Sequence, residues 1–516
     1  MQDDQSMTGA APGRRNLLTV CLMVATLMQA LDSTIANVAL PYMQGSLSTT
    51  ADQITWVLTS YVVAAAIMTA PVGWLASRFG RKNFFAACLV GFTVTSMMCG
   101  AAQSLEQMVA FRLMQGVCGA ALVPLSQSTM MDIYPVQQRG SAMAIWGMGV
   151  MVGPILGPTL GGYLTNVYNW RWVFYVNLPF GVLAVTGLLI LMPKAPVNKE
   201  MRFDWTGFGV LALGIGALQM MLDRGLSQDW FNSREVIIEA VLAGLGTYLF
   251  LVHLATAPRP FIPPVIFRDL NFVMAMLMMF AVGMVLLASS ALLAPYLQNL
   301  AGYPVEDAGL LLAPRGLGTM IAMMIAGRLA SRVDPRKLMG VGLVLLTWSL
   351  YAMSSWTPDV PEWDLVAVTM VQGAGLGFVF IPLQVVGFAT LPPLLRTDGS
   401  ALLSLVRNVG SAIGISVTSF MLATNQQSEH ARLAEVATPF NHLLHGSAPL
   451  ARLLNPATEH GAVLLDGMIN RQATIIAYND DFRLMMLAAI LPMVLLFVMR
   501  RPGAPKGPVE AHAVMD

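Results

Sequence analysis

The stretch Gly73-Trp-Leu-Ala-Ser-Arg-Phe-Gly-Arg-Lys82 returns about half a chain length later as Gly327-Arg-Leu-Ala-Ser-Arg-Val-Asp-Pro-Arg-Lys337, with one residue inserted. Both copies follow a long apolar segment, and both place Arg and Lys where that segment ends. Membrane proteins built from two related halves are commonly transporters in which one half rocks against the other. The repeat therefore predicts two related halves, with alternating-access transport as the leading hypothesis.

Two further echoes follow in the same order along the chain. The pairs are Gln115-Gly116 with Gln372-Gly373, followed by Pro124-Leu125 with Pro382-Leu383, and then Gly140-Ser-Ala142 with Gly399-Ser-Ala401. Repeats in one order at a slowly growing offset favour duplication with small insertions over chance matches between apolar helices.

The composition is that of an integral membrane protein. Of the 516 residues, 56% are hydrophobic and 11% are charged, whereas a soluble protein has about 25% charged residues. The formal net charge of +1 predicts no nucleic-acid partner. The four Cys residues lie in apolar stretches, so neither a disulfide framework nor a metal site is expected. Arg14-Arg15 precedes an apolar run too long for a signal-peptide core, which predicts a retained first span.

A bilayer-crossing helix needs about 20 apolar residues, and the sequence predicts about fourteen such runs. They lie near 17–40, 54–76, 83–102, 106–130, 140–164, 171–192, 205–222, 234–257, 271–298, 308–330, 338–356, 364–390, 400–424 and 482–500. Basic residues such as Arg78, Arg81 and Lys82 gather in alternate turns, while Glu306 and Asp307 lie in an opposite turn. By the positive-inside rule, both termini are expected in the cytoplasm.

The expected organisation is all-α, with six spans in each half and two extra spans between the halves. Cytoplasmic tails are predicted at 1–16 and 501–516, an N-terminal six-helix bundle at 17–192, two additional spans with linkers at 193–270, and a C-terminal six-helix bundle at 271–500. A long external loop is expected at 425–481, with an amphipathic stretch at 460–476. Docking of a partner protein and a simple insertion remain open for this loop.

Asp32 lies inside the first predicted span. A charged carboxylate is costly at membrane depth, and such residues commonly carry protons. We therefore predict that Asp32 couples transport to protons; the alternative is a structural Asp that caps a neighbouring helix. Gln29 and Ser33 are close to it along the helix. Asn37 lies five residues on, about 140° around the helix, and these three are candidates for the substrate path.

Arg112 is the cation inside the fourth predicted span, and Gln115 lies one turn away on the same face. An unpaired Arg at this depth is costly, so it should meet a carboxylate, a backbone carbonyl or a water-filled cavity. The second-half echo has Thr369 in its place. We predict that Arg112 assists proton coupling and that Gln115 lines the substrate path. A structural tie to carbonyl groups is the alternative.

The fifth predicted span carries small residues at a spacing of four. They are Gly149, Gly153, Gly157 and Gly161, with Gly162 adjacent and with Pro154 and Pro158 interleaved. Such glycines form a groove that lets another helix approach closely, and the prolines break the hydrogen-bond ladder. Tight packing alone explains the glycines, whereas the combination predicts a helix that also flexes.

Gly73, Arg78, Gly80 and Arg81 are the predicted gating loop between spans two and three. Arg315, several residues into the tenth span, either meets an anionic substrate or extends to the outer surface. The sequence has no His-Glu-x-x-His, no phosphate-binding loop and no nucleophile elbow. We therefore predict no enzyme activity and no cofactor, so that pumping would draw on the proton gradient.

These motifs together resemble the major facilitator superfamily, and within it the fourteen-span drug:proton antiporters of the EmrB/QacA type. The matching segments are Leu31–Pro41 in the first span, Gly73–Lys82 in the loop, Arg112-x-x-Gln115-Gly116 in the fourth span, Gly149–Gly162 in the fifth and Trp170–Gly181 after it. One departure is Ser77, where the superfamily usually has an Asp that pairs with cations to latch the outward-open state.

The resemblance implies the major facilitator fold and proton-coupled export of amphipathic or aromatic drug-like compounds across the bacterial inner membrane. The 219–231 segment and the 425–481 loop are similar to members that work with a periplasmic membrane-fusion adaptor and an outer-membrane channel. These partners are therefore expected, with the loop as a docking surface. The alternative is a proton-driven exporter of one native metabolite, such as a siderophore or a fatty or aromatic acid, in which Arg315 would matter.

Overall fold

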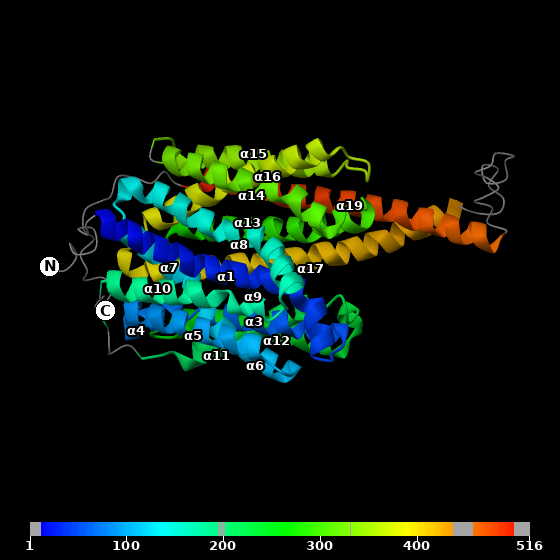
Figure 1. The fold of residues 1–516 in the computed structure, drawn as a ribbon. Helices are drawn as coiled ribbons and strands as arrows, with labels where there is room; N and C mark the ends of the chain where they lie inside the picture. Colours follow the sequence, from blue (N-terminus) through cyan, green and yellow to red (C-terminus); the bar gives the residue numbers. More distant parts are fainter. Residues whose placement is uncertain (1–11, 194–196, 198–201, 331, 437–457, 500–516) are drawn as a thin grey trace.

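The computed structural model describes residues 12–193, 197, 202–330, 332–436 and 458–499, and the regular elements in these ranges are all helices. Most of them run alongside one another in a single elongated bundle (Figure 1). Helix α1 (Pro12–Ser46) begins at the same end of the bundle at which α19 (Glu459–Val498) finishes. We call this the terminal end.

The helices form two series with an extra pair between them. The first half contains α1, the short α2 (Ala51–Ile54), α3 (Trp56–Thr69), α4 (Val72–Phe79), α5 (Arg81–Ala101), α6 (Leu105–Gly119), α7 (Leu122–Ile133), α8 (Arg139–Val167), α9 (Trp172–Tyr175) and α10 (Asn177–Leu191). The extra pair is α11 (Trp205–Arg224) and α12 (Arg234–Thr256). The second half contains α13 (Leu270–Pro295), α14 (Val305–Leu329), α15 (Pro335–Met353), α16 (Glu362–Ala389), α17 (Arg396–Val436) and α19.

Eleven described helices are long and apolar enough to cross a membrane, or twelve if α3 and α4 form one bent span. The two meet at 62° beside Pro71, which lacks the N–H that an unbroken helix would use. Helices α8 and α15 are 29 and 19 residues long and pack among these spans. The count of fourteen spans and the domain boundaries stay predictions.

The sequence repeat is also a repeat of packing. An added Cβ at Gly116 on α6 would lie 2.5 Å from the carbonyl oxygen of Tyr61 on α3. In the second half, an added Cβ at Gly373 on α16 would meet the carbonyl oxygen of Arg315 on α14. Arg315 follows Tyr61 by the same number of residues by which Gly327 follows Gly73. The glycine that marks each echo therefore lets an equivalent pair of helices approach closely.

The echoes also touch across the two halves at the terminal end. Gly73 in the first basic turn packs against Asp398, beside the Gly399 echo at the start of α17. Reciprocally, an added Cβ at Gly327 in the second basic turn would lie 2.7 Å from the carbonyl oxygen of Gly140 at the start of α8. Each basic turn thus contacts the Gly-Ser-Ala echo of the opposite half, and the two halves are in contact at this end.

The extra pair packs through α11 against α3 and α17, one helix from each half. Thr59 on α3 donates a hydrogen bond to Asp223 near the end of α11. Ser416 on α17 donates to the carbonyl oxygen of Leu222, at 3.1 Å. The two extra helices are therefore attached to both halves of the bundle.

The described parts of the segment expected as an external loop at 425–481 are helical, so the expectation of a loop conformation was wrong there, and its external position stays a prediction. Helix α17 continues to Val436, and α19 begins at Glu459, while 437–457 lies outside the described residues. The two helices pair outside the rest of the bundle, far from the terminal end (Figure 1). Polar contacts join them, from Gln426 to Asn470 at 3.0 Å and from His430 to Asp466 at 3.0 Å. We call this paired extension the arm.

Candidate functional site

Asp32 lies in the middle of α1 with no exposed surface, and three side chains from two helices donate hydrogen bonds to its carboxylate. Nη1 of Arg112 on α6 donates to Oδ2 at 2.7 Å. Nε2 of Gln115, one turn further along α6, donates to Oδ1 at 2.8 Å. Nδ2 of Asn177, the first residue of α10, donates to Oδ1 at 3.1 Å. Asp32 therefore connects α1 to α6 and α10 through one buried carboxylate.

The guanidinium of Arg112 is held on several sides. Its Nε donates to the carbonyl oxygen of Val57 on α3 at 3.0 Å, and its Nη1 also donates to Oε1 of Gln115 at 2.9 Å. The guanidinium carbon lies 4.6 Å from the ring centroid of Tyr61 and 5.4 Å from that of Phe174. Cations over aromatic faces are stabilised most where water is excluded. The structure thus brings together Asp32, Arg112 and Gln115, as the sequence hypothesis requires.

Neither member of this ion pair has exposed side-chain surface. Removing one partner from a buried pair leaves an uncompensated charge, which costs about 3–5 kcal/mol. A proton delivered to Asp32 would have a similar local effect, because it cancels the charge that holds Arg112. The arrangement can therefore convert one proton into a change in how tightly α1 is bound to α6.

Asn177 and Ser96 belong to this cluster and were not assigned to it from the sequence. Nδ2 of Asn177 also lies 3.0 Å from Oγ of Ser96, and that hydroxyl donates to the carbonyl oxygen of Phe174 at 2.9 Å. Both side chains are fully buried. The available signal was a single amide, Asn177, at the head of the apolar run that forms α10.

Three predicted substrate-path residues form no hydrogen bond to the Asp32 carboxylate. Ser33 is exposed and donates to the carbonyl oxygen of Ala30 in its own helix, at 2.9 Å. Asn37 is also exposed, and Gln29 is half-buried. Because successive residues are 100° apart around a helix, neighbours of Asp32 in sequence point elsewhere. Their role in the substrate path stays a prediction.

Helix α8, which contains the fifth predicted span and its antiporter-like glycine motif, packs its glycines against α1. An added Cβ at Gly153 would lie 2.6 Å from Ala30, and one at Gly161 would lie 2.9 Å from Ile35. Thr34 occupies the space beside Gly157 and donates to the carbonyl oxygen of Gly153 at 3.2 Å. These glycines bring α8 against the helix that carries Asp32.

The outer members of the motif pack less tightly. The nearest atoms to an added Cβ are 3.5 Å away at Gly149 and 3.9 Å away at Gly162. The side chains of Pro154 and Pro158 lie outside the described residues, although α8 continues through both positions. Flexing of α8 therefore stays a prediction.

The predicted gating loop lies in the contact between the halves at the terminal end. Arg81 forms an ion pair with Asp132 at the end of α7, and Nη1 of Arg396 in the second half reaches the same carboxylate at 2.7 Å. Arg81 Nη2 also donates to Oγ1 of Thr397, at 3.1 Å. Asp132 thus joins a cation from each half.

The backbone of the loop explains its glycines. Gly80 has a φ of +84°, a conformation that glycine adopts without the strain of a side chain. Gly73 leaves the space that Asp398 fills, and Arg78 lies in the last turn of α4. The loop has Ser77 in place of the usual acid, but two other acids, Asp132 and Asp398, lie against the loop.

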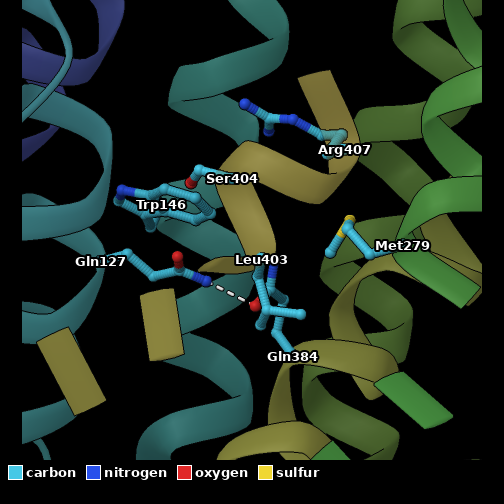
Figure 2. A pocket seen from close by; sticks show the side chains of 7 residues that line it. All are labelled: Gln127, Trp146, Met279, Gln384, Leu403, Ser404 and Arg407. Atoms are coloured by element: carbon cyan, nitrogen blue, oxygen red, sulfur yellow. Dashed lines mark hydrogen bonds between the residues drawn. The ribbon is translucent and has the colours of Figure 1, made fainter. Parts of the chain in front are cut away.

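A small pocket that is almost completely filled by its own side chains lies between the halves, further along the bundle from this contact. Figure 2 shows its side chains, with the hydrogen bond from Gln127 in the first half to Gln384 in the second. Trp146 lies beside Gln127, and Arg407 lies at the opposite end of the pocket from Gln384. The indole Nε1 of Trp146 donates to Oγ of Ser126 at 2.9 Å, which fixes the ring. The pocket joins amides, an aromatic face and a cation from both halves.

Arg315 does not extend to the outer surface. Its Nη1 donates to Oγ of Ser290 at 2.8 Å, and its Nη2 donates to Oγ of Ser289 at 2.9 Å and to the carbonyl oxygen of Leu286 at 3.0 Å. The side chain therefore reaches from α14 to α13. Hydroxyl and carbonyl acceptors on α13 replace the water that it would find at the surface.

The comparisons with known proteins agree with this architecture. Residues 22–415 match the profile of the Major Facilitator Superfamily. The chain is 34% identical over 484 residues to the multidrug export protein EmrB of Escherichia coli (strain K12), covering 93% of this chain and 94% of that protein. It is 33% identical over 468 residues to the fatty acid resistance protein FarB of Neisseria gonorrhoeae, covering 90% of this chain and 92% of that protein.

Among solved structures, the human organic anion transporter MFSD10 (TETRAN) aligns with a TM-score of 0.57. The alignment covers 94% of this chain and 100% of that chain at 14% identity, so it speaks to the fold alone. The profile match covers most of the chain and the curated relatives match along nearly their full length, and these findings accord with the two related halves. The chain belongs to the major facilitator superfamily.

Proposed function

We propose that this protein is a multidrug efflux transporter that exports amphipathic or aromatic compounds in exchange for protons. The observation that carries the proposal is the buried Asp32–Arg112 pair, which has three amide or guanidinium donors on one carboxylate. Two relatives support export, since one is a multidrug export protein and the other a fatty acid resistance protein. Ionisable groups at this depth commonly mark proton or substrate pathways.

In the proposed cycle, Asp32 takes a proton from the outer side and releases it to the cytoplasm. While Asp32 is ionised, Arg112 binds it and ties α6 to α1. When Asp32 is protonated, Arg112 retains only its bonds to Val57 and Gln115, and the tie is weaker. Substrate enters a cavity between the halves from the cytoplasmic side and leaves outward, so that proton and substrate occupy the transporter alternately.

The contacts at the terminal end would close the cytoplasmic side during release. This proposal places both termini in the cytoplasm and the terminal end at the inner face of the inner membrane. It is supported by the basic side chains at that end, including Arg14, Arg81 and Arg336. Asp132, which holds cations from both halves, would stabilise the closed arrangement.

The arm would then project into the periplasm and dock a membrane-fusion adaptor that leads to an outer-membrane channel. Its two helices extend beyond the rest of the bundle (Figure 1) and leave apolar side chains exposed, such as Val463 at 67% and Met468 at 54%. Exposed apolar surface on a soluble extension is a common mark of a protein interface. Deleting 426–470 should abolish co-purification of an adaptor while the transporter stays in the membrane.

The proposed proton coupling is tested by Asp32→Asn. Dye efflux would be followed in energised cells, with and without a protonophore, while membrane abundance is measured in parallel. The variant should lose gradient-driven efflux, whereas Glu106→Gln, which neutralises an exposed acid in the first turn of α6, should behave as wild type. If the Asp32 variant still exports dye at the wild-type rate and with the same protonophore sensitivity, Asp32 is not the proton site.

A second candidate function is export of one native organic acid. The observations that favour it are the hydrogen bonds of Arg315 on α14 to acceptors on α13 and the similarity to a fatty acid resistance protein. A deletion strain decides between the two: sensitivity to many unrelated compounds supports multidrug export, and sensitivity confined to one class of acids supports the narrower function.

A further inference from the structure

The position that carries the Asp32–Arg112 ion pair in the first half corresponds, in the second half, to a hydroxyl that contacts the guanidinium of Arg315. Ser289 follows Asp32 by the same number of residues by which Gln372 follows Gln115. By this register, α13 carries a hydroxyl at the position of the Asp32 carboxylate. Arg315 contacts that hydroxyl, but it comes from α14 rather than from the counterpart of α6. The buried cation of the first half is neutralised by an acid, and that of the second half is not.

Arg407 is a second cation in the same part of the second half. Arg407 lies on α17, and the turn that carries it packs against Gly283 on α13. An added Cβ at Gly283 would meet the carbonyl oxygen of Arg407. Gly283 lies one turn before Leu286, which accepts a bond from Arg315. Both cations are therefore borne by helices that contact α13 at neighbouring turns.

The guanidinium of Arg407 has no hydrogen bond or ion pair with the residues that the structure describes. Figure 2 shows it extending from α17 at the opposite end of the pocket from Gln384. The side chain is half-buried and lines the pocket between the halves. A partnerless guanidinium between the two halves of a membrane transporter is costly unless a ligand or water meets it.

Acidic groups do not satisfy these cations within the described part of the chain. The side chains around the pocket are two amides, one indole, one hydroxyl and two apolar groups besides Arg407. None of the ion pairs among the described residues includes Arg315 or Arg407. The buried Asp481 on α19 has no partner for either oxygen among the described residues, so it does not form an ion pair with them.

We propose that Arg407, with Arg315 as a second cation, forms a binding subsite for the acid group of an amphipathic organic anion. The anion's apolar part would lie against Trp146 and Met279, which line the same pocket as Arg407. The pocket is nearly filled in this arrangement, so the subsite opens when the halves separate. This inference rests on the proposed export function and narrows its substrates to anions.

The test compares two ligands that differ only in charge, biphenyl-4-carboxylate and biphenyl-4-carboxamide. The full-length protein in phosphatidylcholine nanodiscs would be titrated by calorimetry at pH 7, with empty nanodiscs as the blank. A charge-assisted hydrogen bond contributes enough that losing it should weaken binding about tenfold or more. Arg407→Gln should weaken binding of the carboxylate to that extent and change the affinity for the carboxamide by no more than about twofold.

Three further variants sharpen the result. Arg407→Lys keeps the charge and should retain most of the carboxylate preference. Arg315→Gln should reduce carboxylate binding selectively. Arg432→Gln, which removes an exposed cation from the arm, should leave the affinity for both ligands unchanged. Equal weakening of both ligands by Arg407→Gln, or no weakening of the carboxylate, overturns the subsite.

The wild-type protein provides a test that does not depend on the variants folding. It should bind the carboxylate about tenfold more tightly than the carboxamide, and equal affinities overturn the proposal. Because this is equilibrium binding at a fixed pH, it requires no proton gradient. If carboxylate binding is selective but the wild-type protein shows no gradient-driven dye efflux, the export proposal fails and the anion subsite stands.

Discussion

Replacing Gly73 by Ala would place a methyl group where the side chain of Asp398 lies. The added Cβ would overlap the carboxylate, while the Cα of Asp398 lies 3.1 Å away. Relief requires α4 and the start of α17 to separate, because Gly73 and Asp398 belong to opposite halves. Forcing an extra carbon into a close-packed contact costs about 1–3 kcal/mol, which lowers the ratio of closed to open molecules about 5- to 150-fold.

The distance between the halves at the terminal end provides the assay. Spin labels would be placed at Phe79 and Leu394, which are 56% and 87% exposed and lie on opposite halves, in a background without the native cysteines. Electron–electron resonance should show a larger long-distance population for Gly73→Ala than for wild type. Gly209→Ala, where an added Cβ has no neighbour within 4 Å, should leave the distribution unchanged.

The double variant decides whether the overlap itself is the cause. Asp398→Ala removes the atoms that the new methyl group meets, so adding it to Gly73→Ala should restore much of the short-distance population. Asp398→Ala alone measures the effect of losing the charge. A wild-type distribution in Gly73→Ala, or no restoration in the double variant, would refute the reasoning.

Two further predictions concern stability. Asn177→Ala should lower the free energy of unfolding by about 1–3 kcal/mol, since it removes a hydrogen-bond donor from a buried carboxylate. An unchanged melting temperature in detergent would contradict this. Asp204→Ala should cost about 1 kcal/mol because it removes the N-cap of α11, where Gly207 donates at 2.8 Å. Burial acts to raise the pKa of Asp204, but bonds from Gly207 and then His253 lower it overall. Ionised Asp204 therefore makes its full contribution to the free energy of unfolding above the unfolded pKa of about 3.9, and this contribution is lost as pH falls through the folded pKa. If the difference in stability between the variant and the wild type grows below about pH 4, this prediction is wrong.

The ion pair was predictable in part because charged residues stand out in apolar runs. Asp32 and Arg112 are such residues, and the cost of burying an unpaired Arg required a partner for it. Asn177 and Ser96 were not predictable in the same way. Uncharged polar side chains occur throughout membrane helices, and only the packing of α10 against α1 brings Asn177 to the carboxylate.

The arm shows a different limit of sequence reasoning. Spans were delimited by the length of apolar segments, and that rule ends a helix where the bilayer ends. Helices α17 and α19 continue past that point because their polar turns still form helix and pair with one another. The direction of Arg315 was also undetermined, because snorkelling and binding to a neighbouring helix use the same long side chain.

The reciprocal contacts of the repeated turns explain how one fold holds two different charge arrangements. In both contacts, a glycine of one half lies against the first turn of a helix in the other, so the close approach was duplicated. Beside Gly399 stands Asp398, whereas Arg139 stands beside Gly140. Duplication therefore preserved the steric requirement and left the charges free to diverge. We propose that Asp132 and Asp398, which bring acids to the same contact from each half, take the place of the carboxylate that the superfamily pattern has at position 77.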